Sequence, residues 1–290
     1  MELIPGNAFV RRKTGDAIMQ ANFDAVTELT KPTISRSDGY LKLLSFVVSN
    51  ARKGEIMAIE NYSEMVHLMP DTDAKIETVN QARQECKHIL LLEKLAKRIG
   101  FPIDDTMVEP QWESIRESFH EAVRRKDLPA CLIIQDLMVE SLAIGLYKVF
   151  ASAANEDHET VGVAANLLKD ELEHLDIGIK RIQGEMAKDP DAVNDSLLWA
   201  HSRVMPPLFE MIHRSCDFLC EEKQLNCTMV EKPSSEIDLE LLKITALEHY
   251  VAMLDQANFD PKITNQLIAS MASYEAPGRA SAGLEFLRKH

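Results

Sequence analysis

The residues in this chain that could do chemistry are glutamates followed three positions later by a histidine. An α-helix turns once in about 3.6 residues, so this spacing places a carboxylate and an imidazole on one helix face, where both can bind one metal ion. The sequence contains five such pairs, Glu64/His67, Glu85/His88, Glu117/His120, Glu171/His174 and Glu210/His213. The spacing alone is therefore weak evidence, and the neighbours on each face must separate buried pairs from solvated ones.

Two of the pairs lie in apolar stripes. Glu85 and His88 share their face with alanine, isoleucine and leucine, and Glu171 and His174 have similar neighbours. These neighbours are Ala82, Ile89, Leu92 and Leu95 for the first pair, and Ala164, Leu167, Leu168, Leu175 and Gly178 for the second. Burying a charged group without compensation costs several kcal/mol, so both pairs require partners in the interior, and a metal ion is one such partner.

The other three pairs have polar surroundings. The faces of Glu64/His67 and Glu117/His120 carry further charged side chains, which predicts that water solvates them. The pair Glu210/His213 is intermediate, because Phe209 is accompanied there by Arg203, Arg214 and Asp217. We therefore do not count these three pairs among the predicted metal ligands.

Each buried pair should have a lone glutamate on the preceding long helix. Glu140 is one candidate, since its segment is otherwise apolar. In the first long helix the choice lies between Glu55 and Glu60. Glu55 shares its stripe with alanine, isoleucine and tyrosine, and it precedes Glu85 by 30 residues, much as Glu140 precedes Glu171 by 31. The repeated spacing favours Glu55 and indicates two similar helix pairs.

Turn and capping residues predict the helices that position these side chains. Pro70 ends the first long helix, Asp71 and Thr72 can cap the second, and Gly100 with Pro102 ends it. Few glycines and prolines, with frequent alanine, leucine and glutamate, also favour helices. The predicted helical segments are 38–69, 72–99, 110–126, 129–154, 156–188, 190–222, 234–258 and 261–274.

Two lone glutamates and two such glutamate–histidine pairs, from four helices, are the ligand set of the di-metal carboxylate site in ferritin-like bundles. We therefore predict an all-α protein, a ferritin-like four-helix bundle with additional N- and C-terminal helices. The predicted metal ligands are Glu55, Glu85, His88, Glu140, Glu171 and His174. Glu85 and Glu171 would bridge two metals, while Glu55 and Glu140 would be terminal ligands. Asp170 and Gln135 could orient ligands or be ordinary solvated or structural residues.

This ligand set selects among metals, because oxygen-rich sites with two imidazoles suit iron or manganese and lack the thiolates of structural zinc sites. Two iron ions are expected, with manganese possible. The domain organisation that follows is an N-terminal extension over 1–35, a diiron helical domain over 36–275 and a tail over 276–290. Within that domain, Pro206 and Pro207 should kink or split the helix over 190–222.

Charge and composition exclude several functions. The formal net charge of −14 opposes binding to nucleic acid or anionic lipid. The sequence shows no export signal, and no apolar run is expected to span a membrane, so we expect a cytoplasmic protein. Five cysteines make a disulfide framework improbable. Cys216 and Cys220 lie four apart on a predicted helix, which could bring them together, although incidental thiols are the commoner case.

Several blocks of the sequence resemble the aldehyde-deformylating oxygenases, also called long-chain aldehyde decarbonylases. The resemblance covers about residues 35–275, and all six predicted ligands fall on ligand positions of that family. Tyr62, Gln135 and Tyr147 match residues near its metal and substrate channel, which implies catalytic roles for them. The resembling blocks are GEIMAIENYSEMVHLMPD (54–71), QECKH (84–88), CLIIQDLMVESLAIGLY (131–147) and KDELEHLDIG (169–178).

The resemblance implies a cytosolic diiron enzyme that cleaves a long-chain aldehyde to a hydrocarbon and formate, using O2 and an external electron donor such as ferredoxin and its reductase. An apolar tunnel is then expected. One alternative is the same metal chemistry directed to N-oxygenation of an amine or hydrazine, for which a polar pocket is expected. Iron binding or storage is an alternative of another class. Six apolar residues could contribute to the tunnel, although ordinary core packing is the commoner role for each: Phe46, Met65, Ile133, Leu137, Ile144 and Leu168.

Overall fold

The computed structural model describes residues 36, 38–153, 157–223 and 239–271 of the 290-residue chain. The predicted N-terminal extension and C-terminal tail lie outside these residues. In the described part the secondary structure is helical throughout, as predicted. The helices are α2 (Asp38–Met65), α3 (Thr72–Ile99), α4 (Glu109–Arg124), α5 (Leu128–Leu132), α6 (Glu140–Ala153), α7 (His158–Met186), α8 (Pro190–Lys223), α9 (Leu239–Gln256) and α10 (Pro261–Met271), with a 3₁₀ turn (Asp105–Val108) and the π-helix η2 (Ile133–Val139).

The ends of α3 follow the capping chemistry that the sequence predicted. The Asp71 side chain accepts a hydrogen bond from the Ala74 backbone N–H at 2.9 Å, which satisfies a free donor of the first turn. Gly100 ends the helix in the left-handed conformation at φ 95°, where its N–H donates to the Ala96 carbonyl. These caps fix where α3 begins and ends, and so fix the height of its ligands in the bundle.

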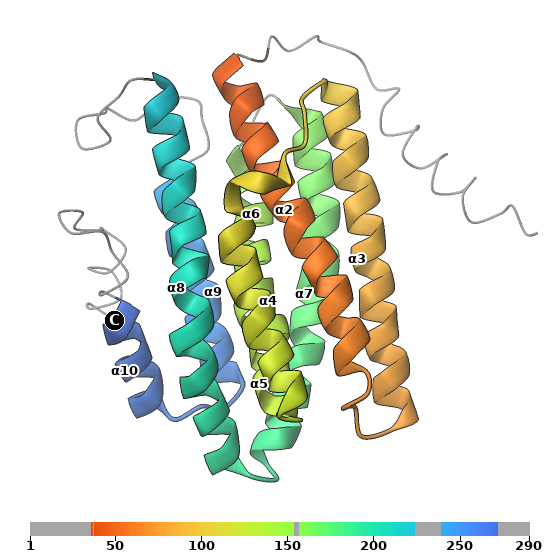
Figure 1. Cartoon of the computed structure of the whole chain (residues 1–290), viewed down its shortest axis with the longest axis vertical. Helices are drawn as coiled ribbons and strands as arrows, with labels where there is room; N and C mark the ends of the chain where they lie inside the picture. Colours follow the sequence, from red (N-terminus) through yellow and green to blue (C-terminus); the bar gives the residue numbers. More distant parts are fainter. Residues whose placement is uncertain (1–35, 37, 154–156, 224–238, 272–290) are drawn as a thin grey trace, which may run out of the picture. The chain divides into compact units, whose positions relative to one another are not determined.

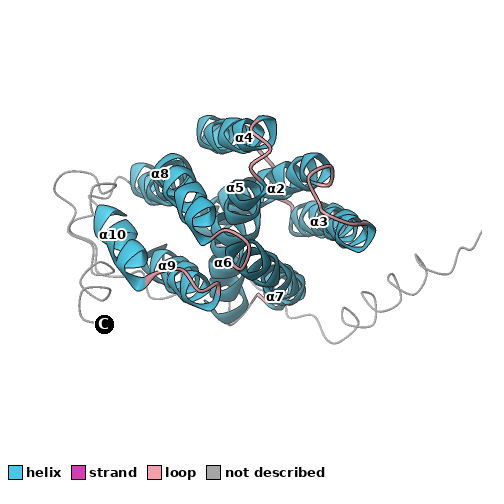
Figure 2. Cartoon of the chain, turned by 90° about the horizontal axis from the view of Figure 1, so that it is seen from below, coloured by secondary structure: helices cyan, strands magenta, loops and turns pink. Residues whose placement is uncertain are grey.

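The bundle at the centre of the fold consists of α2, α3, the continuous segment α5–η2–α6, and α7 (Figures 1 and 2). Helix α2 packs against α3, and α6 packs against α7, while α3 and α7 join the two pairs. Further helices cover the outside: α4 and α8 pack together, and α9 lies against α6. This arrangement confirms the predicted fold class.

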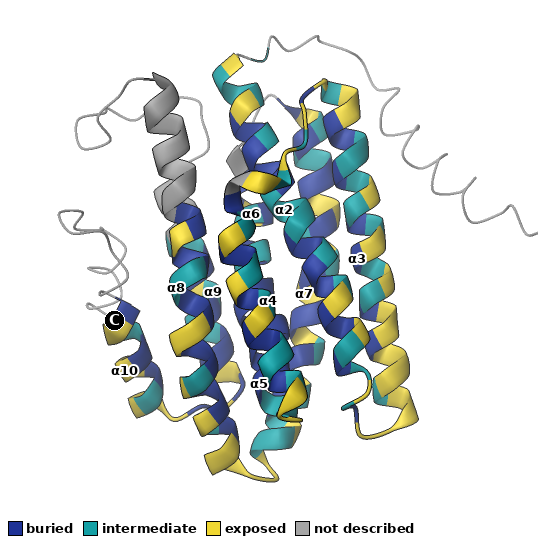
Figure 3. Cartoon of the chain, viewed as in Figure 1, coloured by how far each residue is buried: buried dark blue, intermediate teal, exposed yellow. Residues whose placement is uncertain are grey.

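The segment α5–η2–α6 runs through the middle of the structure, and most of its side chains are buried (Figure 3). Its stretch Leu128–Ala151 is long and apolar enough to cross a membrane, with a mean hydropathy of 1.5, contrary to the expectation that no run would be. However, most of this stretch is buried inside the structure. A helix surrounded by protein on every side needs this composition, which explains the high hydropathy.

Helix α8 contradicts one prediction. Pro206 and Pro207 were expected to kink or split it, yet one uninterrupted helix runs from Pro190 to Lys223. Proline removes backbone hydrogen bonds but does not forbid helical dihedral angles, so a helix held by neighbours can continue through it. Here α8 packs against α4, α5 and α7. The side chains of Cys216 and Cys220 on this helix lie outside those that the structure describes.

Candidate metal centre

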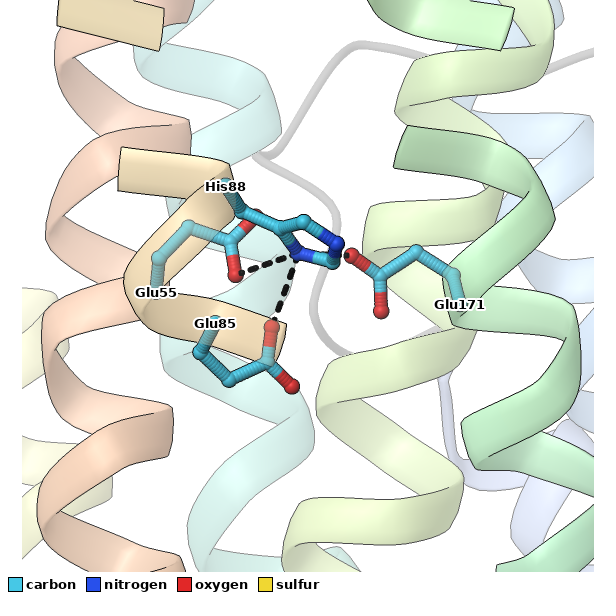
Figure 4. Close-up of side chains that lie close together, drawn as sticks. All are labelled: Glu55, Glu85, His88 and Glu171. Atoms are coloured by element: carbon cyan, nitrogen blue, oxygen red, sulfur yellow. Dashed lines mark hydrogen bonds and ion pairs between the residues drawn. The ribbon is translucent and has the colours of Figure 1, made fainter. Parts of the chain in front are cut away.

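The structure brings all six predicted ligands together in the interior of the bundle, and none of them is more than 6 % exposed. Four helical segments supply them, α2, α3, the start of α6, and α7, as the ferritin-like template requires. Figure 4 shows four of these side chains pointing toward one another. The set comprises Glu55, Glu85, His88, Glu140, Glu171 and His174.

These side chains form two overlapping groups, each with ligand atoms within 4.8 Å of one another. One group contains Glu55 and His88, and the other contains Glu140 and His174. Both groups include Glu85 and Glu171. Because Glu85 and Glu171 belong to both groups, they are the residues that would bridge two metals. Each group then has one further glutamate and one histidine. The arrangement is therefore compatible with a two-metal site.

Both imidazoles turn Nδ1 toward the carboxylates. His88 Nδ1 lies 2.8 Å from Glu85 and 3.1 Å from Glu171, and His174 Nδ1 lies 3.0 Å from Glu85. Each Nε2 faces outward, His88 toward Asp170 Oδ2 at 3.4 Å and His174 toward Gln84 Oε1 at 3.2 Å. With hydrogen on Nε2, both rings donate outward and offer the Nδ1 lone pair to a metal.

Unsatisfied atoms at the centre test whether a metal fits. Four buried atoms lack a hydrogen-bond partner although oppositely charged groups lie close: Glu85 Oε1 and Oε2, Glu171 Oε1, and His174 Nδ1. Buried polar atoms are nearly always satisfied, so these atoms require an explanation. They belong to the two shared carboxylates and to one imidazole, and a cation between them would satisfy them. The residues present therefore fit a pair of metal ions.

The electrostatics of the cluster point the same way. Burial and the nearby Glu171 carboxylate raise the pKa of Glu55 to about 8. Burial and Glu171 also raise the pKa of Glu140 well above its usual value. Burial opposes charge on His174, but hydrogen bonds to Glu171 and Glu85 outweigh it and raise its pKa to about 10. Two of the four carboxylates, Glu55 and Glu140, thus favour their protonated form here, while hydrogen bonds to the histidines keep the pKa values of Glu85 and Glu171 low. Two divalent cations would take the place of those protons.

Tyr147 and Gln135, both implied as functional by the resemblance, contact predicted ligands directly. The Tyr147 hydroxyl donates to Glu55 Oε1 at 2.5 Å. The Gln135 amide donates to Glu140 Oε1 at 3.0 Å, and Asn61 holds the other end of that amide at 2.7 Å. Of the two orienting candidates, Gln135 therefore supports Glu140, and Asp170 lies beside His88. Both assignments have a structural basis.

Tyr62 belongs to a second, deeper network. Its hydroxyl lies 3.0 Å from Glu140 Oε1 and 3.1 Å from Asp136 Oδ1, and it accepts a hydrogen bond from Gln81 at 3.2 Å. Arg181 donates to Gln81 at 2.8 Å and lies 3.6 Å from Asp136. Tyr62 therefore contacts a predicted ligand and is not part of the lining of the cavity described below.

Asp136, Gln81, Gln84 and Arg181 were missed by the sequence reasoning. Asp136 had a detectable signal, because an acid in an otherwise apolar segment needs a buried partner, as was argued for Glu140. Its partners could not be predicted from the α-helical period, because Asp136 lies in the π-helix η2. A wider turn brings positions five apart onto one face, which is how Gln135 reaches Glu140. Gln84 and Arg181 lie on ordinary polar positions and gave no signal.

The remaining glutamate–histidine pairs lie away from the centre. His67 is exposed, while Glu64 is half-buried and pairs with His120 across helices at 2.9 Å. Glu117 is exposed. Glu210 accepts a hydrogen bond from Gln111 at 2.8 Å. The pairs over 64–67 and 117–120 are therefore on solvated faces, as predicted.

A cavity of about 60 Å³ reaches the predicted ligands from the side of α2, α4, α6 and α8. Glu55, Glu140 and Glu171 form its inner end. Most of the wall is apolar and comprises Val47, Ala51, Gly54, Ala58, Trp112, Val139, Leu142, Ala143, Leu146, Met211 and Ile212, with Asn50, Gln135 and Tyr147 as the polar members.

None of the six residues that could contribute to an apolar tunnel lines this cavity, and they take the other role considered for them, packing in the core. Five of them are buried in the core, and Leu168 packs against it. An unbroken α-helical period does not describe 133–139, because the π-helix η2 changes the register of Ile133 and Leu137 relative to Glu140, and both are packed in the core. The cavity is instead lined by Val139, Leu142, Ala143 and Leu146.

The fold and this buried cluster define the class as ferritin-like helical proteins with a site compatible with two metals. The chain belongs to the long-chain fatty aldehyde decarbonylase family, whose model matches residues 37–219. The fold is similar to that of "Protein 19 with aldehyde deformylating oxidase activity" from Synechococcus, at a TM-score of 0.67 and 18 % identity, covering 81 % of this chain and 98 % of that one. It is also similar to a mutant of an R2-like ligand-binding oxidase with an aerobically reconstituted Mn/Fe cofactor, at a TM-score of 0.63 and 19 % identity, covering 77 % and 83 % of the two chains.

Proposed function

We propose that this protein is a non-haem diiron oxygenase that cleaves a long-chain aldehyde to a hydrocarbon one carbon shorter and formate. Family membership supports the class of reaction. The observation that carries the substrate class is the cavity, which joins an apolar wall directly to the carboxylates of Glu55, Glu140 and Glu171. The cavity of about 60 Å³ takes the polar end and the first carbons of such a substrate beside the metals, and the rest of a long alkyl chain must extend beyond it.

The stoichiometry of the proposed reaction determines how many electrons must be supplied. An aldehyde RCHO, O2, four electrons and three protons give RH, formate and one water, so the C1–C2 bond breaks and O2 is the oxidant. Two iron ions, held by Glu55, Glu85, His88, Glu140, Glu171 and His174, would supply the reduction of O2. Because the aldehyde itself supplies none of the four electrons, a separate reductant is required.

The protein's own residues prepare the site for this chemistry. The apolar wall excludes water from the substrate chain and strengthens polar interactions at the inner end. Burial and the Glu55 charge raise the pKa of Tyr147 well above its usual value, so its hydroxyl keeps its proton and donates to Glu55. Gln135 holds Glu140 in the same way. These bonds keep both terminal carboxylates in place while substrate enters beside them.

The lining argues against an amine or hydrazine as substrate. Apart from the three predicted ligands, the described cavity residues carry no charged side chain, and their polar groups are Asn50, Gln135 and Tyr147. Asn50 Oδ1 is taken by the indole N–H of Trp112 at 2.6 Å. A polar pocket was expected for N-oxygenation, whereas beyond the three carboxylates this wall is mostly apolar and suits an alkyl chain. The cavity therefore supports the aldehyde over N-oxygenation.

The test loads the protein with ferrous iron and supplies octadecanal, O2 and a reductant. We expect heptadecane and formate in equal amounts, measured by gas chromatography and a formate assay. Glu171→Ala should bind less than two irons per chain and lose the products, while the matched variant Glu64→Ala should keep both. Oxidation of octadecylamine with octadecanal untouched would refute the aldehyde assignment, and ferric mineral beyond two irons per chain would indicate storage.

A further inference from the structure

The outer face of the second half of α3 carries an exposed leucine and an exposed cysteine among cationic side chains. Leu90 is 64 % exposed at its centre, and Cys86 is exposed one turn away. Helix α3 packs against α2 and α7, which leaves this face at the edge of the bundle (Figure 2). The residues of this surface, called the α3 surface below, are Arg83, Cys86, Lys87, Leu90, Lys94 and Lys97.

The charge of this region is opposite to that of the chain. The whole chain has a net charge of −14, yet residues 83–98 contain five cationic side chains, of which Arg98 pairs with Glu159 of α7 at 2.8 Å. Their carboxylates are Glu85, which is buried in the metal centre, and Glu93, which Arg52 binds at 2.8 Å. Exposed apolar area within a charged rim is the composition of a protein-docking surface, and the sign of the rim selects an acidic partner.

The α3 surface also lies next to a short connection to the metal centre. His88 is on the same helix and reaches Asp170 of α7 through Nε2 at 3.4 Å. The Asp170 side chain is 29 % exposed, whereas that of His88 is 1 % exposed. One exposed carboxylate thus joins this surface to a predicted ligand.

We propose that the α3 surface docks an acidic protein carrying a one-electron redox centre, which delivers electrons to the metals through Asp170 and His88. The proposal rests on the proposed function, which requires an external reductant. In each transfer the carrier loses one electron and one ferric ion becomes ferrous, so two carriers reduce the pair. Complementary charge speeds such an encounter and weakens with salt.

The observations favour this partner over a second copy of the chain. Two copies paired through this face would bring the cations of Arg83, Lys87 and Lys97 near their own equivalents, which is destabilising. An acidic carrier meets the same cations with opposite charge. The exposed Leu90 then supplies the apolar contact that holds the complex after the charges have brought it together.

Binding tests the proposal independently of turnover. The probe is a plant-type [2Fe–2S] ferredoxin, and its affinity for the iron-loaded full chain is measured by surface plasmon resonance at several salt concentrations. We expect binding that weakens with salt, and a loss of about tenfold or more in Arg83→Glu/Lys97→Glu and in Leu90→Glu. The control Lys126→Glu/Lys262→Glu makes the same charge change at exposed lysines outside α3 and should bind as wild type does.

Electron delivery gives the second readout. Stopped-flow reduction of the ferric centre by reduced ferredoxin should slow in the surface variants, while reduction by dithionite should keep the wild-type rate. Equal binding and rates in all proteins, or no binding by wild type, would overturn the proposal. So would light scattering that shows a wild-type dimer lost in Arg83→Glu/Lys97→Glu. Normal reduction by ferredoxin without cleavage of octadecanal would instead refute the proposed function and leave the docking surface standing.

Discussion

At the scale of single residues, the centre depends on what holds the ligands as much as on the ligands. Each predicted terminal carboxylate accepts a hydrogen bond from a neighbour, Glu55 from Tyr147 and Glu140 from Gln135. Each histidine faces one outward partner, and for His88 this partner is Asp170. Such outer contacts fix the tautomer and the ring orientation, and they make the imidazole a better donor to metal.

Asp170→Ala should therefore weaken metal binding without removing a ligand. The Nε2 proton of His88 would lose its acceptor, so we expect an affinity for ferrous iron about 10- to 100-fold lower than in wild type. A competition titration with a chromogenic chelator measures this. Asp176→Ala is the control, because Asp176 is an exposed aspartate on the same helix. Equal losses in both variants would argue against the role of Asp170.

At the scale of elements, the π-helix η2 is the feature that shapes the site. It carries Gln135 and Asp136 into the interior just before Glu140. Room for Asp136 comes from α7, where Gly178 lies directly opposite. A Cβ added to Gly178 would lie 2.3 Å from Asp136 Cβ, closer than real Cβ atoms approach. The wide turn and this glycine therefore depend on each other.

Gly178→Ala should destabilise the protein by about 1–3 kcal/mol, because two buried helices would have to separate. Urea unfolding followed by circular dichroism gives the free energy of unfolding. Gly162→Ala is the matched control on the same helix, where an added Cβ meets nothing within 4 Å. It should raise the free energy of unfolding by about 0.5–1 kcal/mol, since alanine favours a helix over glycine. A gain in both variants would disprove the close packing.

His201 joins α8, α9 and α10, and its burial makes this junction sensitive to pH. Its Nδ1 lies 2.9 Å from the Tyr250 hydroxyl, and its Nε2 lies 3.5 Å from Ser270. Burial lowers the pKa of His201 to about 4 from 6.5. Between these values the unfolded chain binds a proton that the folded protein does not. The free energy of unfolding therefore falls as pH falls through this window.

One unprotonated histidine changes the free energy of unfolding by about 1.4 kcal/mol for each pH unit in this window, so the loss of stability reaches roughly 3 kcal/mol by pH 4. Other groups titrate in the same range, so the measured quantity is the difference between wild type and His201→Gln. We expect wild type to lose more stability than the variant between pH 6.5 and 4 in urea unfolding. Parallel curves would show that His201 is not the group responsible.

The sequence was sufficient for the regular helices that carry the predicted ligands, although it wrongly predicted a break in α8. The caps at Asp71 and Gly100 fix the ends of α3, and the apolar stripes identified Glu85 and Glu171 as buried, because side chains within one regular helix keep a constant period. The same period failed between 133 and 147. A π turn has no simple composition signature, so the cavity wall and Asp136 were found only in the structure. Partners across helices, such as Gln84 and His174, depend on packing and gave no local pattern.

At the scale of the whole molecule, the candidate metal centre places several ionisable side chains close together inside a helical core. Four buried carboxylates repel one another there, and several of their oxygens lack partners. Cations that bind the folded state alone stabilise it by mass action. The stability of the bundle should therefore depend on metal supply more strongly than on any single apolar contact around the site.

Iron loading should raise the melting temperature. Free metal at about 100 times its dissociation constant adds roughly 2.7 kcal/mol, which corresponds to about 5–10 °C for a chain of this size. Differential scanning calorimetry with ferrous iron under argon, and then with a chelator, measures the shift and its reversal. Glu171→Ala should show little change with iron, and an equal shift in both proteins would place the stabilising metal elsewhere.

The cavity and the α3 surface occupy different parts of the molecule, because no α3 residue contributes to the cavity wall in the described chain. Because the substrate and the electron carrier would bind at separate places, either of them can bind first. We expect ferredoxin and octadecanal to follow random-order kinetics, with neither acting as a competitive inhibitor of the other. A carrier could then exchange several times while one aldehyde stays bound, so a reaction needing four single electrons would never have to release its substrate between deliveries.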